Sequence, residues 1–183
     1  MIIFQKTLPL LLTFTPIEPY GVRSFSETEL QQIDHALEML PVKNLYRFCI
    51  QEGIKPAYAY AYMISNLDLD NRCILTHRKL VRSPMGGSFH IEELAEEQIQ
   101  YLSAYSIDVL KNQLEMRLAM NASESDLLFT SESGKQLTPP TMHIYNKMLK
   151  TLSGVSDVNL QALMSDQKYK RKRILKGETD AEK

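Results

Sequence analysis

The stretch from residue 26 to residue 41 constrains the fold most, because it carries both the start and the stop signal of a helix. Ser26 and Glu29 form a capping box, in which the Ser26 hydroxyl accepts from the Glu29 amide and the Glu29 carboxylate reaches back. The apolar residues that follow recur at helical spacing: Leu30, Ile33, Leu37 and Leu40. Pro41 ends the run. An amphipathic helix of this kind must pack its apolar face against other elements, so a globular domain is expected.

The next segments extend the helical pattern. A second helix is predicted over residues 42–51, with apolar side chains on one face and Gly53 as its natural end. Residues 56–65 (PAYAYAYMIS) fit two structures. The tyrosines alternate as in a strand, whereas Pro56 in a first turn and three alanines favour a short helix. We favour the helix, and periodicity alone does not decide between the two.

The middle of the chain predicts a β-hairpin followed by helix. Residues 66–71 (NLDLDN) form a loop or turn. Residues 73–77 and 88–91 are the two strands of a candidate hairpin, joined by the flexible connection Ser83-Pro84-Met85-Gly86-Gly87. Residues 92–120 are predicted as one long amphipathic helix or two consecutive ones, because leucine and isoleucine recur through them at helical intervals.

The last third of the chain predicts two more helices. A polar loop covers residues 121–126, a short buried segment 127–129, and a turn surrounds Gly134. Thr138 is the expected N-cap of a helix that begins at Pro139 and ends at Leu149 or Leu152. A final helix is expected from about residue 158 into a basic segment. The fold class is therefore α+β, mainly α-helical: one helical domain with a small antiparallel β-element.

Composition places the chain among soluble globular proteins, but its charge is unevenly distributed. The 183 residues are 44% hydrophobic and 23% charged, with 7 Gly and 8 Pro, which excludes disordered and collagen-like chains. The 21 basic and 22 acidic residues give a net charge of −1. Six basic residues and no acidic one fall in 168–176 (KYKRKRILK), which leaves 15 basic against 22 acidic residues elsewhere, or −7. An acidic body thus carries a basic C-terminal segment.

The N-terminal residues and the two cysteines indicate where in the cell the protein is expected. Residues 8–14 (LPLLLTF) are apolar but too short to span a bilayer, and they lack the flanking pattern of a signal peptide. We expect residues 1–25 to form an extended segment packed on the domain, with no membrane association. Cys49 and Cys73 lie among apolar neighbours without CxxC or metal-type spacing, as expected of buried reduced thiols. A cytoplasmic location is expected.

Local motifs give no support for an enzyme, a metal site or a cofactor. The four histidines show no metal-ligand spacing, and neither a glycine-rich phosphate loop nor a nucleophile elbow is present. Basic residues, by contrast, cluster around the hairpin, on one face of the helix after Thr138, and at residues 170–173. Clustered Lys and Arg are what phosphate binding requires. A solvated hairpin and a frayed tail would carry the same residues.

The order of these segments resembles the catalytic domain of the tyrosine recombinases, the family of phage integrases and Xer-type enzymes. Residues 53–71 (GIKPAYAYAYMISNLDLDN) are similar, without gaps, to the family pattern G-L-R-x-S-E-L-L-x-L-x-x-x-D-I-D-L-x-N. FSETEL at 25–30, HIEELAEEQIQYLSAY at 90–105 and LLFTSESGKQLTPPTMHIYNKML at 127–149 resemble further family segments in the same order. The resemblance covers about residues 25–165 and implies the integrase catalytic-core fold.

The positions that carry the family's chemistry differ in this chain. The alignment places Lys55 at the first catalytic arginine and Gln161 at the second. It places Val158 and Ala162 where the family has histidines. No tyrosine follows at a suitable distance, because Tyr169 is only a few residues further on. Lysine cannot offer phosphate the planar fork of arginine. Since phosphoryl transfer depends on positioned charge, the resemblance implies a core that does not cleave DNA.

The sequence thus predicts a catalytically inactive, integrase-like DNA-binding protein with a regulatory or architectural role on a mobile element or plasmid. Residues 26–165 would form the recombinase-like domain and residues 166–183 a basic tail. The partner would be double-stranded DNA, and the expected contacts are Lys55, Arg78, Lys79, Arg82, Lys147, Lys150, Lys170, Arg171, Lys172 and Arg173.

The alternative is a protein-interaction module that kept the fold but lost DNA binding. The acidic body favours it, as would exposure of the tyrosines in residues 58–62. A protein partner or a second copy of the chain would then use the C-terminal segment. One continuous positive face would support DNA binding, whereas positive charge confined to the tail would support the alternative.

Overall fold

The computed structural model describes residues 23–175, so most of the predicted N-terminal segment lies outside the described residues. The elements are α1 (Glu27–Glu38), α2 (Lys43–Glu52), α3 (Pro56–Ala59), the 3-10 helix η1 (Ile64–Asn66), β1 (Leu67–Asp68), β2 (Cys73–Arg82), β3 (Phe89–Tyr101), α4 (Ala104–Ala119), α5 (Pro139–Ser153) and α6 (Leu160–Leu175). Within this part of the chain, none of the helices has the length and apolar character needed to cross a membrane.

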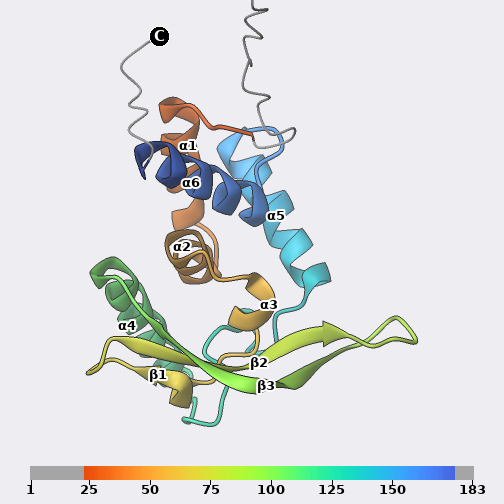
Figure 1. Ribbon diagram of the computed structural model, residues 1–183. Coiled ribbons are helices and arrows are strands. Elements are labelled where there is room, and N and C mark those ends of the chain that lie inside the picture. The colour runs from red at the N-terminus through yellow and green to blue at the C-terminus, as the bar shows by residue number, and fades with distance from the viewer. Residues whose placement is uncertain (1–22, 176–183) are drawn as a thin grey trace, which may run out of the picture.

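The molecule is mixed α+β, as predicted, with a group of helices at one end and a small antiparallel sheet, beside α4, at the other. Figure 1 shows α1, α5 and α6 grouped at the helical end, the sheet at the opposite end, and α2 and α3 between them. The strand order is β1-β2-β3, so β3 is an edge strand. One core joins both ends, because α2 packs against α4 and α6 while α3 packs against β2. Its largest fully buried side chains include Tyr46, Phe48, Phe129, Leu110 and Leu149.

The first two helices begin and end as the sequence predicts. The Ser26 hydroxyl accepts from the Glu29 amide at 3.3 Å, and the Ser26 amide donates to the Glu29 carboxylate at 3.0 Å. The hydrogen bonds that the Ser26 amide and then the Ser26 hydroxyl donate to the Glu29 carboxylate, together with Arg23, hold the pKa of Glu29 below its ordinary value. α2 ends at Gly53, whose φ of 71° lies in the left-handed region that favours glycine. The predicted capping box and the predicted glycine stop are both confirmed.

The alternating tyrosines are mostly packing residues. The short helix favoured by the sequence begins at Pro56 but ends at Ala59 rather than continuing to residue 65. Tyr60 and Tyr62 are 5% and 2% exposed, and burial raises the pKa of both phenols, that of Tyr62 to about 12. The Tyr62 hydroxyl shares a hydrogen bond of 2.7 Å with the Thr76 hydroxyl of β2. Tyr62 therefore joins the sheet to α2, where its ring lies against Phe48, and neither tyrosine forms an exposed interface.

The long helix predicted over residues 92–120 is wrong in its first third. β3 continues to Tyr101, and α4 begins only at Ala104, behind the N-cap Ser103. Leucine and isoleucine recur here at intervals that suit a helix, but pairing with β2 overrides that local preference. The paired positions include Glu93 with Arg78, Glu92 with Lys79, and Ile91 with Leu80. Such cross-strand pairs of opposite charge or matching apolar character stabilise the ladder.

Other predicted elements form with smaller differences. β2 extends to Arg82, well beyond residue 77, and the predicted loop at 66–71 contains the short strand β1. Thr138 is the N-cap of α5, but its side chain makes no capping bond to the backbone, and its hydroxyl lies 3.1 Å from the Thr141 hydroxyl. Pro140, at the second position of α5, removes one of the two backbone amides that such a cap would bind. The short segment at 127–129 is buried as predicted, at Leu128 and Phe129.

The basic C-terminal segment continues a packed helix. α6 runs from Leu160 to Leu175, so the boundary predicted between residues 165 and 166 falls inside it. Asp166 is 1% exposed, and its carboxylate accepts from the Phe25 amide at 3.4 Å. The side chains of residues 169, 170 and 172–175 lie outside the described part, so the predicted DNA contacts Lys170, Lys172 and Arg173 stay predictions.

A single carboxamide joins three helices. Asn146 of α5 accepts, through Oδ1, from the Tyr46 hydroxyl of α2 at 2.7 Å and from the Leu160 amide at 3.1 Å. Leu160 is the first residue of α6, so its amide has no partner within its own helix. The start of α6 is thereby fixed against both α2 and α5.

Candidate nucleic-acid interface

A positively charged cleft of about 460 Å³ lies between the end of α2 and one face of α6. Its lining residues are Ile50, Gly53, Lys55, Gln161, Met164, Ser165, Gln167, Lys168 and Arg171. Lys55, Lys168 and Arg171 are cationic, and none of these described lining residues is acidic. The cleft therefore favours an anion.

The backbone between α2 and α3 places Lys55 in the cleft. α2 stops at Gly53 in the left-handed conformation, and the next residue, Ile54, is buried in the core. Lys55 then has the extended backbone expected before a proline, with φ −61° and ψ 131°, and is the N-cap of α3. Its side chain is exposed and forms no ion pair with another described residue. The Lys55 ammonium is therefore available to a ligand.

α6 supplies the opposite side of the cleft. Gln161, Ser165, Lys168 and Arg171 follow one another at intervals of three or four residues, so they share one face of the helix. The Arg171 guanidinium donates to the Gln51 carbonyl at the end of α2. This bond holds α6 against α2 and satisfies one of the carbonyls that a helix C-terminus leaves without a partner.

The cleft can bind a phosphate, but it presents few groups for phosphoryl transfer. Lys55 and Lys168 are point charges, and the single guanidinium, that of Arg171, is partly engaged with a backbone carbonyl. Among the described lining residues there is no imidazole, carboxylate or phenol, and the one hydroxyl belongs to Ser165. The two positions that the sequence alignment equates with the family's arginines, Lys55 and Gln161, line the same cleft.

Two of the three basic residues predicted to bind DNA from the hairpin are paired with carboxylates. Arg78 Nη2 lies 3.2 Å from Glu93 Oε1, and Lys79 Nζ lies 3.8 Å from Glu92 Oε2. The register of β3 on β2 brings these carboxylates opposite the cations. Arg78 is also half-buried and donates to the Met63 sulfur at 2.8 Å. These two residues therefore offer a ligand less charge than their sequence suggests.

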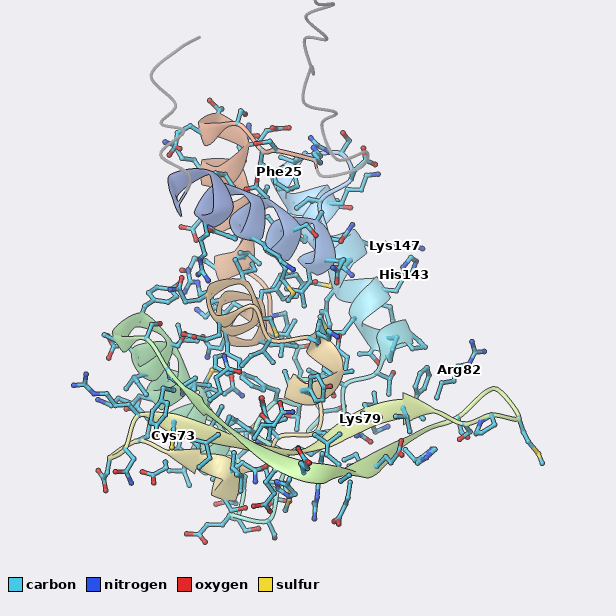
Figure 2. The ribbon with its side chains drawn as sticks, in the orientation of Figure 1. Phe25, Cys73, Lys79, Arg82, His143 and Lys147 are labelled. Atoms are coloured by element: carbon cyan, nitrogen blue, oxygen red, sulfur yellow. The ribbon has the colours of Figure 1, made fainter. Side chains whose placement is uncertain are left out.

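The outer end of the hairpin keeps its charge. Arg82 is exposed and forms no ion pair with another described residue, and no acidic residue occurs in 82–91. Figure 2 shows Arg82 on the same side of the molecule as His143 and Lys147 of α5. Lys147 and Lys150 are exposed, on the face of α5 away from its buried residues.

The predicted DNA contacts thus fall into separate groups. Lys55 and Arg171 meet in the cleft, whereas none of the predicted hairpin or α5 residues is among its described lining residues. Sequence reasoning missed Lys168 as an individual contact. The signal for it is present, because the helical spacing that begins at Gln161 continues through Ser165 to Lys168 once the basic segment is treated as helix.

Residues 23–175 contain no group of three or more His, Cys, Asp or Glu side chains that could hold a metal ion. Cys49 is buried, Cys73 is half-buried, and neither forms a disulfide. Burial raises the pKa of the Cys49 thiol, which makes it a poor nucleophile.

Comparison with known proteins identifies the fold through solved structures. No protein-family model and no curated protein sequence matches the chain. The Tn1549 transposon integrase in complex with transposon right-end DNA is similar with a TM-score of 0.67, covering 89% of this chain and 56% of that one at 11% identity. The XerA recombinase has a TM-score of 0.60, covering 89% and 54% at 19% identity. The XerH recombinase bound to its difH substrate has a TM-score of 0.54, covering 94% and 50% at 17% identity.

The chain spans about half the length of these integrase and recombinase structures. At identities of 11% to 19%, the similarity concerns the arrangement of elements and does not carry over the roles of individual residues. The small antiparallel sheet and the helices around it follow the same arrangement as in those proteins. The described chain therefore has the integrase catalytic-domain fold of the tyrosine recombinases.

Proposed function

We propose that this chain is an integrase-like DNA-binding protein that does not itself cut or join DNA, and that it has a regulatory or architectural role on a mobile element or plasmid. The observation that carries the proposal is the cleft, where Lys55, Lys168 and Arg171 converge without an acidic residue among the described lining side chains. A backbone phosphate is an anion that suits this arrangement. Two of the structures with this fold are an integrase and a recombinase in complex with DNA, which supports DNA as the partner.

The lack of strand cleavage is inferred from the side chains that replace the family's catalytic ones. Lys55 and Gln161 occupy the cleft positions aligned with the two arginines. Val158 is buried and Ala162 is half-buried at the positions aligned with the histidines, and neither side chain can transfer a proton. Phosphoryl transfer relies on positioned charge and proton-transfer groups around the phosphate. Such a protein would occupy a DNA site and shape or block it without rearranging strands.

A protein-interaction module is the second candidate, and the hairpin is the feature that favours it. The ion pairs of Arg78 with Glu93 and of Lys79 with Glu92 remove positive charge from that surface. The chain outside residues 168–176 also carries 15 basic against 22 acidic residues. A surface of that sign repels phosphate and suits a basic protein partner. The two candidates differ in their use of the cleft, which DNA binding requires and this alternative does not.

Fluorescence anisotropy with short duplex DNA at two salt concentrations tests the proposal. We expect binding that weakens steeply with salt, because each neutralised phosphate releases counterions. Lys55→Ala and Lys168→Ala should each weaken binding roughly threefold to tenfold on any sequence. Lys79→Ala is the matched control, since this lysine is already paired with Glu92. Its dissociation constant should change by less than about twofold.

Two outcomes would contradict the proposal in different ways. Absence of binding to any duplex at low salt would rule out the DNA-binding function and favour the protein-interaction module. A nicked suicide substrate that trapped a covalent protein–DNA adduct would show that the chain does cut DNA. In that event, loss of the adduct in Tyr169→Phe would identify the nucleophile.

A further inference from the structure

The β2–β3 hairpin ends in a tip with the chemistry of a minor-groove wedge. We propose that Pro84 and Met85 insert between base pairs from the minor groove of duplex DNA, so that the hairpin unstacks and kinks the DNA that the rest of the molecule binds. The inference rests on the proposed DNA-binding function. It adds a second contact, separate from the cleft, and predicts a change in the shape of the DNA.

The backbone holds the tip as a closed turn. The Ser83 amide donates to the Ser88 carbonyl at 3.0 Å, and the Gly86 amide donates to the Ser83 carbonyl at 2.9 Å. Gly86 and Gly87 have φ values of 80° and 86°, a conformation that side chains with a Cβ rarely adopt. The two glycines therefore let the chain reverse within a few residues. Pro84 and Met85 are left at the far end of the hairpin.

Met85 is the most exposed large hydrophobic side chain of the described residues, at 96%. Figure 1 shows the hairpin extending away from the helices, so its tip is clear of the body. Apolar side chains of this kind, methionine and proline among them, are the wedges that architectural proteins insert at a base step. The flexible thioether of Met85 can adapt to the gap that opens between two stacked bases.

The charge of the hairpin changes along its length, and this change favours DNA as the target. Near the body, the two basic residues of β2 are paired with glutamates of β3. Further out, residues 82–91 include Arg82 and His90 and no acidic residue. Arginine and histidine are attracted to the negative potential of a narrow minor groove. The tip therefore combines an apolar wedge with flanking side chains that suit the groove.

The fluorescence of 2-aminopurine tests the insertion, because this base becomes brighter when it unstacks. Short duplexes would each carry one 2-aminopurine, moved stepwise along the sequence. We expect the wild-type chain to raise the fluorescence, and Met85→Ala to reduce that rise to roughly a quarter or less. Met85→Leu keeps an apolar wedge and should retain most of the rise. Met39→Ala removes another exposed methionine, at the end of α1, and should leave the rise unchanged.

The salt dependence of binding separates the wedge from the charge of the hairpin. Met85→Ala should weaken binding roughly threefold to tenfold with no change in the slope of log Kd against log salt, because no phosphate contact is lost. Arg82→Ala should reduce the magnitude of that slope by about one. Arg82 and Met85 lie close together on the same hairpin. A general distortion of the tip would therefore change the affinity and the salt slope together in both variants.

The results distinguish a failure of the proposed insertion from a failure of the proposed DNA binding. If duplexes bind but no 2-aminopurine becomes brighter, or if Met85→Ala behaves as the wild type does, the insertion is wrong and the DNA-binding function stands. If no duplex binds, both are wrong. Circular dichroism and thermal melting of each variant should match the wild type, because Met85 is almost fully exposed. If Met85→Leu lost as much of the 2-aminopurine signal as Met85→Ala, the wedge would also be contradicted.

Discussion

The cleft and the hairpin carry the same kinds of cation but present them differently. In the cleft, Lys55 and Lys168 have no carboxylate among the described residues that line it. In the hairpin, Arg78 and Lys79 lie 3.2 Å and 3.8 Å from carboxylates of the neighbouring strand. An unpaired surface cation can exchange its counterions for a phosphate, whereas a paired one must first lose its carboxylate. The number of basic residues in a segment therefore says less about phosphate binding than the residues that the fold sets opposite them.

Reversing the charge of the cleft should have the largest effect on DNA binding. Lys55→Glu combined with Lys168→Glu should weaken DNA binding by roughly 100-fold at low salt, because two phosphate contacts become repulsive. Fluorescence anisotropy at fixed ionic strength measures the change in dissociation constant. The double variant should fold normally, since both side chains are exposed.

The control for this reversal exchanges a pair in the hairpin. Lys79→Glu with Glu92→Lys moves one lysine across the strand pair and keeps both the net charge and the ion pair. Its dissociation constant should change by less than about twofold. If the exchange weakened binding as much as the reversal in the cleft, the distinction between the two regions would be wrong.

The cleft also depends on a helix junction that the hairpin does not need. Asn146→Ala removes the carbonyl that accepts from the Tyr46 hydroxyl and the Leu160 amide. Because Tyr46 is 0% exposed, its hydroxyl would lose a buried partner, and the free energy of unfolding should fall by about 2 kcal/mol. Urea unfolding measures this change. Asn112→Ala, at an exposed position of α4, should stay within about 0.5 kcal/mol of the wild type.

Removing the carboxylates that pair with the hairpin cations should strengthen DNA binding. Glu92→Gln with Glu93→Gln frees Lys79 and Arg78, so DNA binding should become roughly threefold to tenfold tighter, with a steeper dependence on salt. Anisotropy titrations at several salt concentrations give both quantities.

A matched variant separates the freed cations from the change in net charge. Glu96→Gln with Glu97→Gln neutralises two exposed carboxylates of the same strand that form no ion pair with another described residue. The gain in DNA affinity from this double variant should be clearly smaller than the gain from Glu92→Gln with Glu93→Gln. Equal gains from both double variants would mean that only net charge matters.

The smallest effect concerns an ion pair at the helical end. Hydrogen bonds from Lys43, and then from Arg47, hold the pKa of Glu38 below its ordinary value of 4.5. A lowered folded-state pKa adds stability above the unfolded pKa, and this stability is lost as pH falls through the folded value. Glu38→Gln should therefore make the loss of stability below about pH 5 shallower. Urea unfolding across that range, compared with the wild type, measures the slope. An unchanged slope would contradict the role of Glu38.

The parts of the fold that the sequence predicts well depend on neighbouring residues alone. The Ser26–Glu29 capping box and the Gly53 stop act within one or two turns, so their residues are enough to locate the ends of α1 and α2. The first part of the predicted helix at 92–120 depends instead on β2, because each residue of β3 gains its stability from the strand opposite. The ion pairs that neutralise Arg78 and Lys79 arise from the same register, so the sequence pattern could not show them.

The candidate site divides in the same way. The family pattern around residue 55 locates Lys55 because the turn after α2 is local, with Gly53 and Pro56 on either side. Lys168 becomes a cleft residue only because α6 stays helical and packs against α2, which depends on contacts far apart in the chain. When the basic segment is treated as an unstructured tail, its sequence does not show which of its basic residues face the cleft.

The junction at Asn146 also bears on how fast a ligand can bind. The carboxamide ties α2, α5 and the start of α6 together, and Arg171 ties α6 to the end of α2 a second time. The two walls of the cleft are thus already in position before a ligand arrives, so the protein loses little conformational freedom on binding. Association should then be limited by diffusion and electrostatic steering rather than by a closing motion, with an on-rate that rises as salt is lowered.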